Sequence, residues 1–192
     1  MKNPRGNHPS LSALRIIGGR WRGRKLIFTP TTSLRPTTEV NRERLFNWLA
    51  PYLAGANCLD LFAGSGALGF EALSRGADRV TMVDISGLAL EQLRSNAARL
   101  GTEAIDFYRA DIPTQLAKIN PQEFNVLFLD PPYQTNLVVS SSWALETANY
   151  VSNQALIYLE CERALDPLLP PTWKILRKKQ NRSTSSYLYQ KE

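Results

Sequence analysis

The chain has 192 residues, of which 43% are hydrophobic and 21% are charged, as expected for one globular domain with a small addition. No apolar run approaches the roughly 18 residues of a membrane span, and the first residues lack the apolar core of a secretory signal. We therefore expect a cytoplasmic protein without membrane contact. The single histidine, His8, excludes histidine-rich zinc sites and Ser-His-Asp hydrolysis, and we expect no bound metal.

The charge is distributed unevenly. Residues 1–44 contain ten basic and two acidic residues, a net charge of +8. Residues 45–164 contain seven basic and thirteen acidic residues, net −6, and residues 165–192 contain six basic and two acidic residues, net +4. An acidic body with two basic ends is typical of proteins that bind a polyanion, although a solvated basic tail without a partner gives the same pattern.

The first 44 residues are expected to form a leader and an extension. Residues 1–14 are polar and contain two prolines, which is typical of a flexible leader. Residues 15–28 have the pattern of two short strands joined by glycine turns, which predicts a small basic β-hairpin. The Pro-Thr-Thr sequence at residues 36–38 predicts a helix start. We assign residues 15–44 to a basic N-terminal extension and residues 45–192 to the main domain.

Strands alternate with helices through the main domain. Repeated strand-helix units predict an α/β fold with a seven-stranded, mostly parallel sheet and helices on both faces. The last two strands read as a hairpin that closes the sheet. Strands are expected at residues 57–62, 79–84, 104–110, 124–130, 155–160, 173–178 and 185–189, and helices at 67–75, 88–100, 114–119 and 138–150.

A glycine-rich loop follows the first strand of the main domain. Gly64, Gly66 and Gly69 form a GxGxxG pattern that opens a helix. Such glycines allow a sharp turn and close approach of a ligand to free N–H groups at the helix start. Asp84 ends the next strand, 20 residues after Gly64, where a carboxylate can accept hydrogen bonds from ribose hydroxyls. The pattern indicates a nucleoside-containing cofactor.

Two further acids bear on the identity of that cofactor. NAD and S-adenosylmethionine (SAM) both carry adenosine, but Asp60 precedes the glycines, where a carboxylate attracts a sulfonium or ammonium rather than a pyrophosphate. Asp60 therefore favours SAM. Asp111 follows the third strand and is expected either to bind the adenine amine or to cap a helix.

A rigid turn follows the fourth strand, at Asp130-Pro131-Pro132-Tyr133. Open α/β sheets bind ligands at this edge. The Asp130 carboxylate and the Pro131 carbonyl can accept the two N–H groups of a nucleobase amine, while Tyr133 stacks on the ring. These two hydrogen bonds would orient the nitrogen lone pair toward the methyl group of SAM. Asp130 would also stabilise the positive charge that develops on the nitrogen. The turn thus predicts methylation of an exocyclic amine.

These motifs together resemble the class I SAM-dependent methyltransferases, which have a Rossmann-like fold. Over residues 14–190 the chain is similar to the RsmD family, on Arg15–Leu26 (RIIGGRWRGRKL), Leu34–Thr38 (LRPTT) and Leu45–Leu49 (LFNWL). That bacterial family methylates guanine N2 in small-subunit (16S) ribosomal RNA. The resemblance implies SAM as cofactor, bound by Asp60, Gly64, Gly66, Asp84 and Asp111, and guanine bound at Asp130, Pro131 and Tyr133.

The same resemblance implies that the basic extension binds RNA, free or within the small ribosomal subunit. An arginine guanidinium can donate two parallel hydrogen bonds to one phosphate. Trp21 is expected either to stack on an unpaired base or to cover the sheet. The resemblance thus implies 16S rRNA as the partner, and we expect a monomer. The expected RNA-binding residues are Arg20, Trp21, Arg22, Arg24, Lys25 and Arg35.

Three other functions remain open. A DNA adenine-N6 methyltransferase is the first alternative, because an Asp-Pro-Pro-Tyr turn also suits adenine, although the chain leaves little room for a domain that reads DNA sequence. A non-catalytic RNA-binding assembly factor would retain the fold without the reaction. An NAD oxidoreductase is disfavoured by Asp60 and by the double-proline turn.

Overall fold

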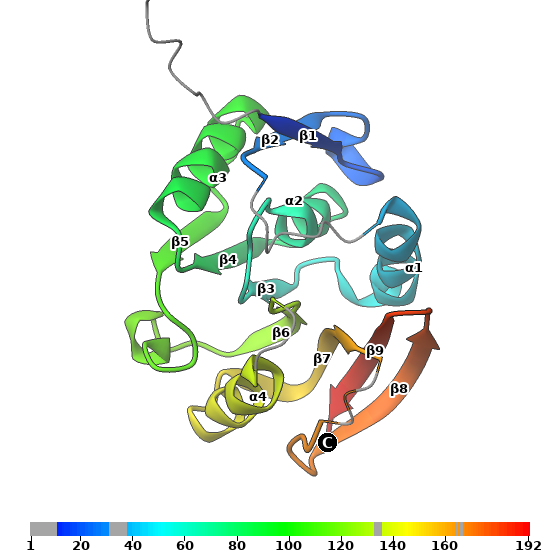
Figure 1. Ribbon diagram of the computed structural model, residues 1–192. Coiled ribbons are helices and arrows are strands. Elements are labelled where there is room, and N and C mark those ends of the chain that lie inside the picture. Colours follow the sequence, from blue (N-terminus) through cyan, green and yellow to red (C-terminus); the bar gives the residue numbers. More distant parts are fainter. Residues whose placement is uncertain (1–10, 31–37, 133–135, 164, 166) are drawn as a thin grey trace, which may run out of the picture.

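A seven-stranded sheet lies at the centre of the computed structural model, which describes residues 11–30, 38–132, 136–163, 165 and 167–192 (Figure 1). The strand order is β5-β4-β3-β6-β7-β9-β8. Strands β3 to β7 pair in parallel, and β9 runs antiparallel to β7 and β8. The predicted α/β fold class is confirmed. The strands are β3 (Asn57–Asp60), β4 (Arg79–Asp84), β5 (Ile105–Arg109), β6 (Phe124–Leu129), β7 (Val151–Glu162), β8 (Trp173–Gln180) and β9 (Thr184–Lys191).

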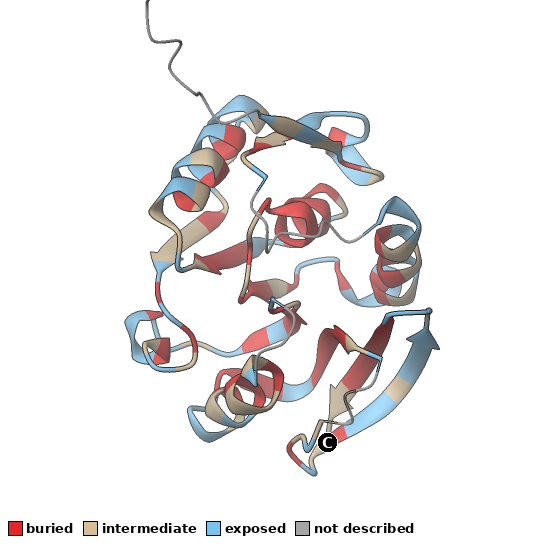
Figure 2. Cartoon of the chain, viewed as in Figure 1, coloured by how far each residue is buried: buried red, intermediate tan, exposed pale blue. Residues whose placement is uncertain are grey.

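Helices cover both faces of the sheet (Figures 1 and 2). One face packs against α1 (Glu39–Leu49), which the short helix η2 (Ala50–Tyr52) continues, and against α2 (Ala67–Ser74) and α3 (Gly87–Leu100). The other face packs against α4 (Leu137–Thr147) and the short helix η3 (Leu116–Lys118). The apolar strand β6 supplies side chains to both cores, as expected for a parallel strand buried on both faces. No helix among the described residues is long and apolar enough to cross a membrane.

The expected helix at residues 114–119 is wrong in type and length, because only the 3₁₀ turn η3 forms there. The Thr114 hydroxyl donates to the carbonyl of Asp111. The Gln115 side chain in turn accepts a bond from the Asp111 N–H. Such local bonds compete with a regular helix.

The N-terminal hairpin is present but begins earlier than expected. Strand β1 (Ser12–Arg15) starts inside the expected leader and pairs antiparallel with β2 (Lys25–Phe28), and a short helix, η1 (Gly19–Trp21), lies between them. Residues 1–10 of the expected leader lie outside the described residues. Side chains of the hairpin, Ile16, Trp21 and Leu26, belong to the same apolar core as α2. The hairpin is therefore packed into the main domain.

This packing corrects the expectation that Trp21 stacks on an RNA base. The Trp21 side chain is only 8% exposed, and the guanidinium of Arg20 lies 4.2 Å from the centre of its ring. Its backbone N–H donates to the Ser74 hydroxyl at the end of α2. Trp21 thus covers the body of the protein, which was the alternative interpretation of its position.

A buried carboxylate on α2 holds the hairpin in place. The Glu71 side chain is fully buried and accepts the backbone N–H groups of Ile17 and Gly18, each at 2.8 Å. It also accepts the Arg75 Nε at 2.7 Å and lies 3.9 Å from the Arg42 guanidinium of α1. Because Arg42 also donates to the Arg15 carbonyl, one carboxylate connects α1, α2 and the hairpin.

We predict that Glu71→Ala lowers the free energy of unfolding by about 3–5 kcal/mol, because it removes the acceptor of two partly buried N–H groups and of Arg75, and the negative charge that faces the buried Arg42 guanidinium. Urea denaturation measures the change. Glu91→Ala, at an exposed position of α3, is the matched control and should stay within about 0.5 kcal/mol of the wild type. An equally small effect of Glu71→Ala would contradict the anchoring role.

Candidate functional site

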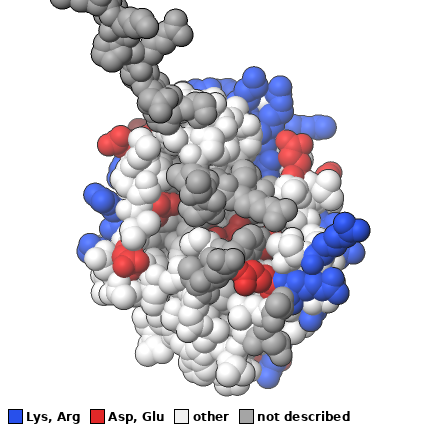
Figure 3. All heavy atoms as spheres, in the orientation of Figure 1, with Lys and Arg blue, Asp and Glu red and all other residues white. Residues whose placement is uncertain are grey.

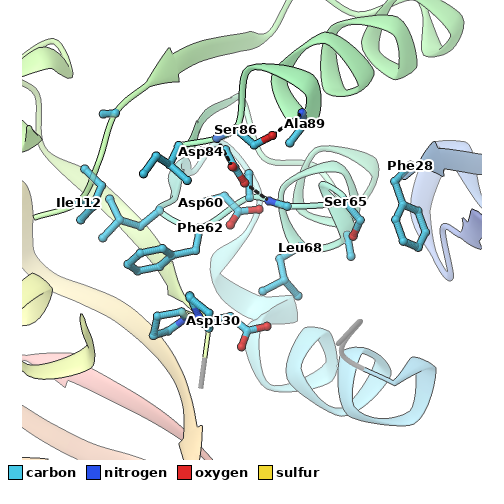
Figure 4. A pocket seen from close by; sticks show the side chains of 18 of the residues that line it. Phe28, Asp60, Phe62, Ser65, Leu68, Asp84, Ser86, Ala89, Ile112 and Asp130 are labelled. Atoms are coloured by element: carbon cyan, nitrogen blue, oxygen red, sulfur yellow. Dashed lines mark hydrogen bonds between the residues drawn. The ribbon is translucent and has the colours of Figure 1, made fainter. Parts of the chain in front are cut away.

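A cavity of about 410 Å³ lies at the carboxyl ends of the parallel strands. Figure 4 shows Asp60 and Asp84 on one side of it and Asp130 on the opposite side. The cavity thus brings together Asp60 and Asp130, which are 70 positions apart in the sequence. The sequence-predicted residues that line it are Asp60, Gly64, Asp84, Asp111, Asp130 and Pro131. Tyr133 and Arg35 lie outside the described residues.

The glycine loop has the conformation that its glycines make accessible. Gly64 and Gly66 have φ values of +49° and +78°, in the left-handed region that side chains disfavour. A Cβ at Gly66 would also lie 2.5 Å from the Leu93 side chain of α3. Gly66 is the N-cap residue of α2 and does not itself line the cavity, so its contribution is to the shape of the loop.

The Asp84 carboxylate joins the glycine loop to the start of α3. One oxygen accepts the Gly64 N–H and the other accepts the Ser86 N–H, both at 2.8 Å. The Ser86 hydroxyl in turn accepts the Ala89 N–H and caps α3. Each carboxylate oxygen keeps a second lone pair, and the half-buried Asp84 lines the cavity. Asp84 can therefore accept ligand hydroxyls while it fixes the loop.

Asp60 ends β3 and is almost completely buried, with 2% of its surface exposed. Its Oδ2 accepts the Gly69 N–H at 3.0 Å. Burial is the main cause that raises the pKa of Asp60 to about 7, the Gly69 N–H opposes the shift, and the negative Asp84 adds to it. A positive ligand in the cavity would favour the ionised form of Asp60 and so gain from its charge.

We compare the free energies of unfolding of Asp60→Asn and the wild type, both without ligand. We predict that this difference increasingly favours the variant as the pH rises. Because folding raises the Asp60 pKa from 3.8 to about 7, its ionised form destabilises the native state. This cost is absent below pH 4, grows between pH 4 and 7, and then stays constant, with an upper size of about 4 kcal/mol. Urea denaturation of both proteins across that range measures it. A difference between the two that does not vary with pH would contradict the shift.

Much of the cavity wall is apolar, and sequence reasoning missed it. Ile85 and Leu88 are 61% and 50% exposed, which is unusual for such side chains, and both line the cavity together with Phe62 and Ile112. Such a wall suits a flat apolar ring. The signal that was available in the sequence is Ile85, an apolar residue placed directly after the acid that ends a strand.

The N-terminal hairpin supplies another part of the wall. Phe28 and Thr29, at the end of β2, line the cavity (Figure 4). The Gln92 side chain of α3 accepts the Thr29 N–H at 2.8 Å and donates to its hydroxyl. Likewise, the Asn96 side-chain amide accepts the Ile27 N–H and donates to the Ile27 carbonyl. Long-range pairing of this kind leaves no local pattern in the sequence.

Asp130 and Pro131 lie where β6 ends. Asp130 is partly exposed and Pro131 is buried, and both line the cavity with Pro132. Asp111, on the neighbouring loop, also lines it. The cap interpretation of Asp111 is not supported, because its hydrogen bonds to Thr114 and Gln115 use backbone groups rather than the carboxylate. Its exposed carboxylate is available to a ligand.

The basic residues of the hairpin differ in their surroundings. The Arg24 guanidinium donates to the Arg99 carbonyl at the end of α3, at 2.7 Å, so it has a structural contact. Arg20 lies over Trp21, as described above. All four basic residues, Arg20, Arg22, Arg24 and Lys25, are exposed. In Figure 3, Lys and Arg side chains gather at the upper right, over the hairpin. This surface carries the charge that the sequence places in residues 15–25.

Comparisons with known proteins agree with this geometry. A family model described as conserved hypothetical protein 95 matches residues 14–190. Ribosomal RNA small subunit methyltransferase D of Escherichia coli is 41% identical over 193 residues, which cover 100% of this chain and 96% of that protein. The Haemophilus influenzae protein of the same name is also 41% identical, over 92% of this chain and 93% of its own length.

Solved structures give the same result. A putative methyltransferase from E. coli superposes with a TM-score of 0.85 at 41% identity, covering 94% of this chain and 99% of that one. A putative methylase from H. influenzae has a TM-score of 0.81 at 38% identity, with the same coverage. A 16S rRNA N2 G1207 methyltransferase of Thermus thermophilus, solved with AdoMet and guanosine, has a TM-score of 0.66 at 18% identity over 95% of this chain and 50% of that one, and shares the fold.

Proposed function

The chain belongs to the RsmD family, and from this premise we propose that it transfers a methyl group from SAM to the exocyclic N2 of a guanine in 16S ribosomal RNA. The observation that carries the proposal is the single cavity that both the glycine loop and the Asp130-Pro131 turn line. A donor and an acceptor of the methyl group would meet there. The names of the relatives support the class of substrate.

The cavity fits the proposed cofactor on three counts. Asp60 is proposed to attract the positive charge of SAM and Asp84 to accept its ribose hydroxyls, while Ile85 and Ile112 would provide an apolar surface for adenine. Gly64 keeps the loop backbone open to close approach. Gly66 shapes that loop, and Asp111 is proposed to accept the adenine amine. Bound there, SAM supplies a methyl group activated by its sulfonium.

The residues on the opposite side suit a planar amine. Asp130 and the Pro131 carbonyl are proposed to accept the two N–H groups of guanine N2, and Tyr133 to stack on the ring. Holding both N–H groups orients the nitrogen lone pair toward the methyl group. The Asp130 carboxylate then stabilises the positive charge that develops on nitrogen, and the proton leaves to Asp130 or to water.

The basic hairpin is proposed to bind the RNA phosphates. Arg22 and Lys25 are exposed, and Arg20 and Arg24 are proposed to add to the same surface. Arg35, which lies outside the described residues, is also proposed to bind RNA. The expected cytoplasmic location, monomeric state and action on the small subunit or an assembly intermediate are part of this proposal. Because Trp21 is buried, stacking of this side chain on an RNA base is not part of the proposal.

We predict that the wild type transfers labelled methyl groups from SAM to undermethylated small ribosomal subunits and that N2-methylguanosine is the product. Asp130→Ala should lose transfer, because the amine is no longer held and its charge no longer stabilised, while calorimetry shows nearly unchanged SAM affinity. Nucleoside analysis of subunits and of duplex DNA distinguishes the alternatives. Methyladenine would establish the DNA or adenine alternative, and full activity of Asp130→Ala would contradict the assigned role.

For the hairpin, we predict that the double variant Arg22→Gln, Lys25→Gln binds the rRNA more weakly. The slope of log affinity against log salt concentration should flatten by about 0.7 for each phosphate that the variant no longer neutralises. Filter binding at several salt concentrations measures the slope. The change should spare SAM affinity, because neither residue lines the cavity. An unchanged slope would reassign the hairpin to a structural role.

A further inference from the structure

The β8–β9 hairpin carries a second set of basic side chains that the proposed function does not use. Arg177 and Lys179 lie on β8, Arg182 lies in the turn, and Arg163 follows β7. We call these four residues the C-terminal basic group. All four are exposed or partly exposed, and none is among the ion pairs that the described part of the chain forms.

Sheet topology places this group at the same end of the sheet as the cavity. Strand β8 is antiparallel to β9, which is itself antiparallel to β7, so β8 runs in the same direction as β6 and β7. Its last residues therefore lie at the carboxyl end of the sheet, the same end as the loops that form the cavity. Arg163 is fixed there by two bonds to the turn, from its N–H to the Ser183 carbonyl and from its guanidinium to the Asn181 carbonyl.

Strand register also places two of these cations on the same face as Asp130. Directly opposed residues of antiparallel strands share a face, and Arg177 and Lys179 pair with Leu188 and Ser186. Leu188 belongs to the core on the α1 face, together with Phe128. Asp130 is two residues beyond Phe128 and so continues on that face. In Figure 3 basic side chains gather at the right, over this region.

The other cations of β8 differ from this pair. Lys178 pairs with Tyr187 and lies 5.0 Å from its ring, on the opposite face. Lys174 lies at the far end of the strand, about 16 Å from Lys179 at the usual rise per residue, and is 3.9 Å from Glu192. Lys174 and Lys178 thus have an acidic or an aromatic partner within the protein. The exposed Arg177 guanidinium donates to the neutral carbonyl of the neighbouring Leu176, and neither Arg177 nor Lys179 is in an ion pair among the described residues.

On these grounds we propose that the C-terminal basic group is a second RNA-binding surface, which holds phosphates of the strand that flanks the target guanine. The inference rests on the proposed function for the identity of the polymer. Three strand spacings separate β8 from β6, about 14 Å, so RNA with a base at Asp130 passes within reach of this group. Together with the N-terminal hairpin, it places positive charge on two sides of the cavity.

A structural role for the same cations is the competing explanation. Strand β8 is an edge strand, and charges on an edge strand prevent pairing with another molecule. Such a role would apply equally to Lys174 and Lys178, which are on the same strand. The double variant Lys174→Gln, Lys178→Gln is therefore a matched control for Arg177→Gln, Lys179→Gln, with the same change of charge.

The test measures binding of undermethylated 16S rRNA and methylation of small subunits by the wild type and both variants. Arg177→Gln, Lys179→Gln should bind rRNA several-fold more weakly and flatten the salt slope by about 1.4, which corresponds to two phosphates. Its KM for subunits should rise while kcat and SAM affinity stay at the wild-type values. The control variant should keep the wild-type slope and KM.

Equal effects of the two variants, or wild-type binding by Arg177→Gln, Lys179→Gln, would overturn the inference. Self-association of both variants without a change in slope would assign the charges to edge protection. The proposed function fails separately, if the wild type methylates no guanine in the rRNA. The binding measurement still decides the role of the surface in that case, because it does not depend on turnover. Thermal melting of each variant checks that it is folded.

Discussion

The carboxylate of Asp84 is the constraint on which the glycine-loop side of the cavity depends. It stands at the end of a buried strand and accepts N–H groups from two different loops, the glycine loop and the start of α3. An apolar side chain at this position would leave both loops without their common acceptor. Because the same carboxylate lines the cavity, the group that shapes the site is also available to bind a ligand.

The second constraint is the buried charge of α2. Every residue of this helix is buried, including Glu71, and a carboxylate in such surroundings persists only when it is paired. Its partners come from the hairpin, from α1 and from the end of α2 itself. The apolar core therefore extends without interruption from the sheet into the N-terminal hairpin.

The sequence predicted those features that depend on local pattern. The alternation of strands and helices, the glycine loop and the acids that end strands all follow from short stretches of sequence, and the carboxyl ends of parallel strands necessarily meet at one edge. Asp60, Asp84 and Asp130 could thus be assigned to one edge of the sheet from the order of the residues alone. The short η3 turn was mispredicted because local bonds to Asp111 outcompeted helix formation there.

Other parts of the site depend on contacts between distant segments and could not be predicted. Nothing near Phe28 or Thr29 indicates that Gln92 and Asn96 will bind this strand to α3. Trp21 has the same neighbours in the sequence whether it faces solvent or the core, and only the packing of the hairpin against α2 decides between them. The raised pKa of Asp60 likewise arises from burial rather than from adjacent residues.

The position of the end of β2 limits which deletions and exchanges the N-terminal hairpin can tolerate. Since Phe28 and Thr29 form part of the cavity wall, the hairpin is not a module that could be deleted or exchanged for that of another protein. A truncated chain would open the cavity to solvent on one side and expose the apolar surface of α2. The proposed binding of the RNA and the proposed binding of SAM thus both depend on one continuous stretch of backbone.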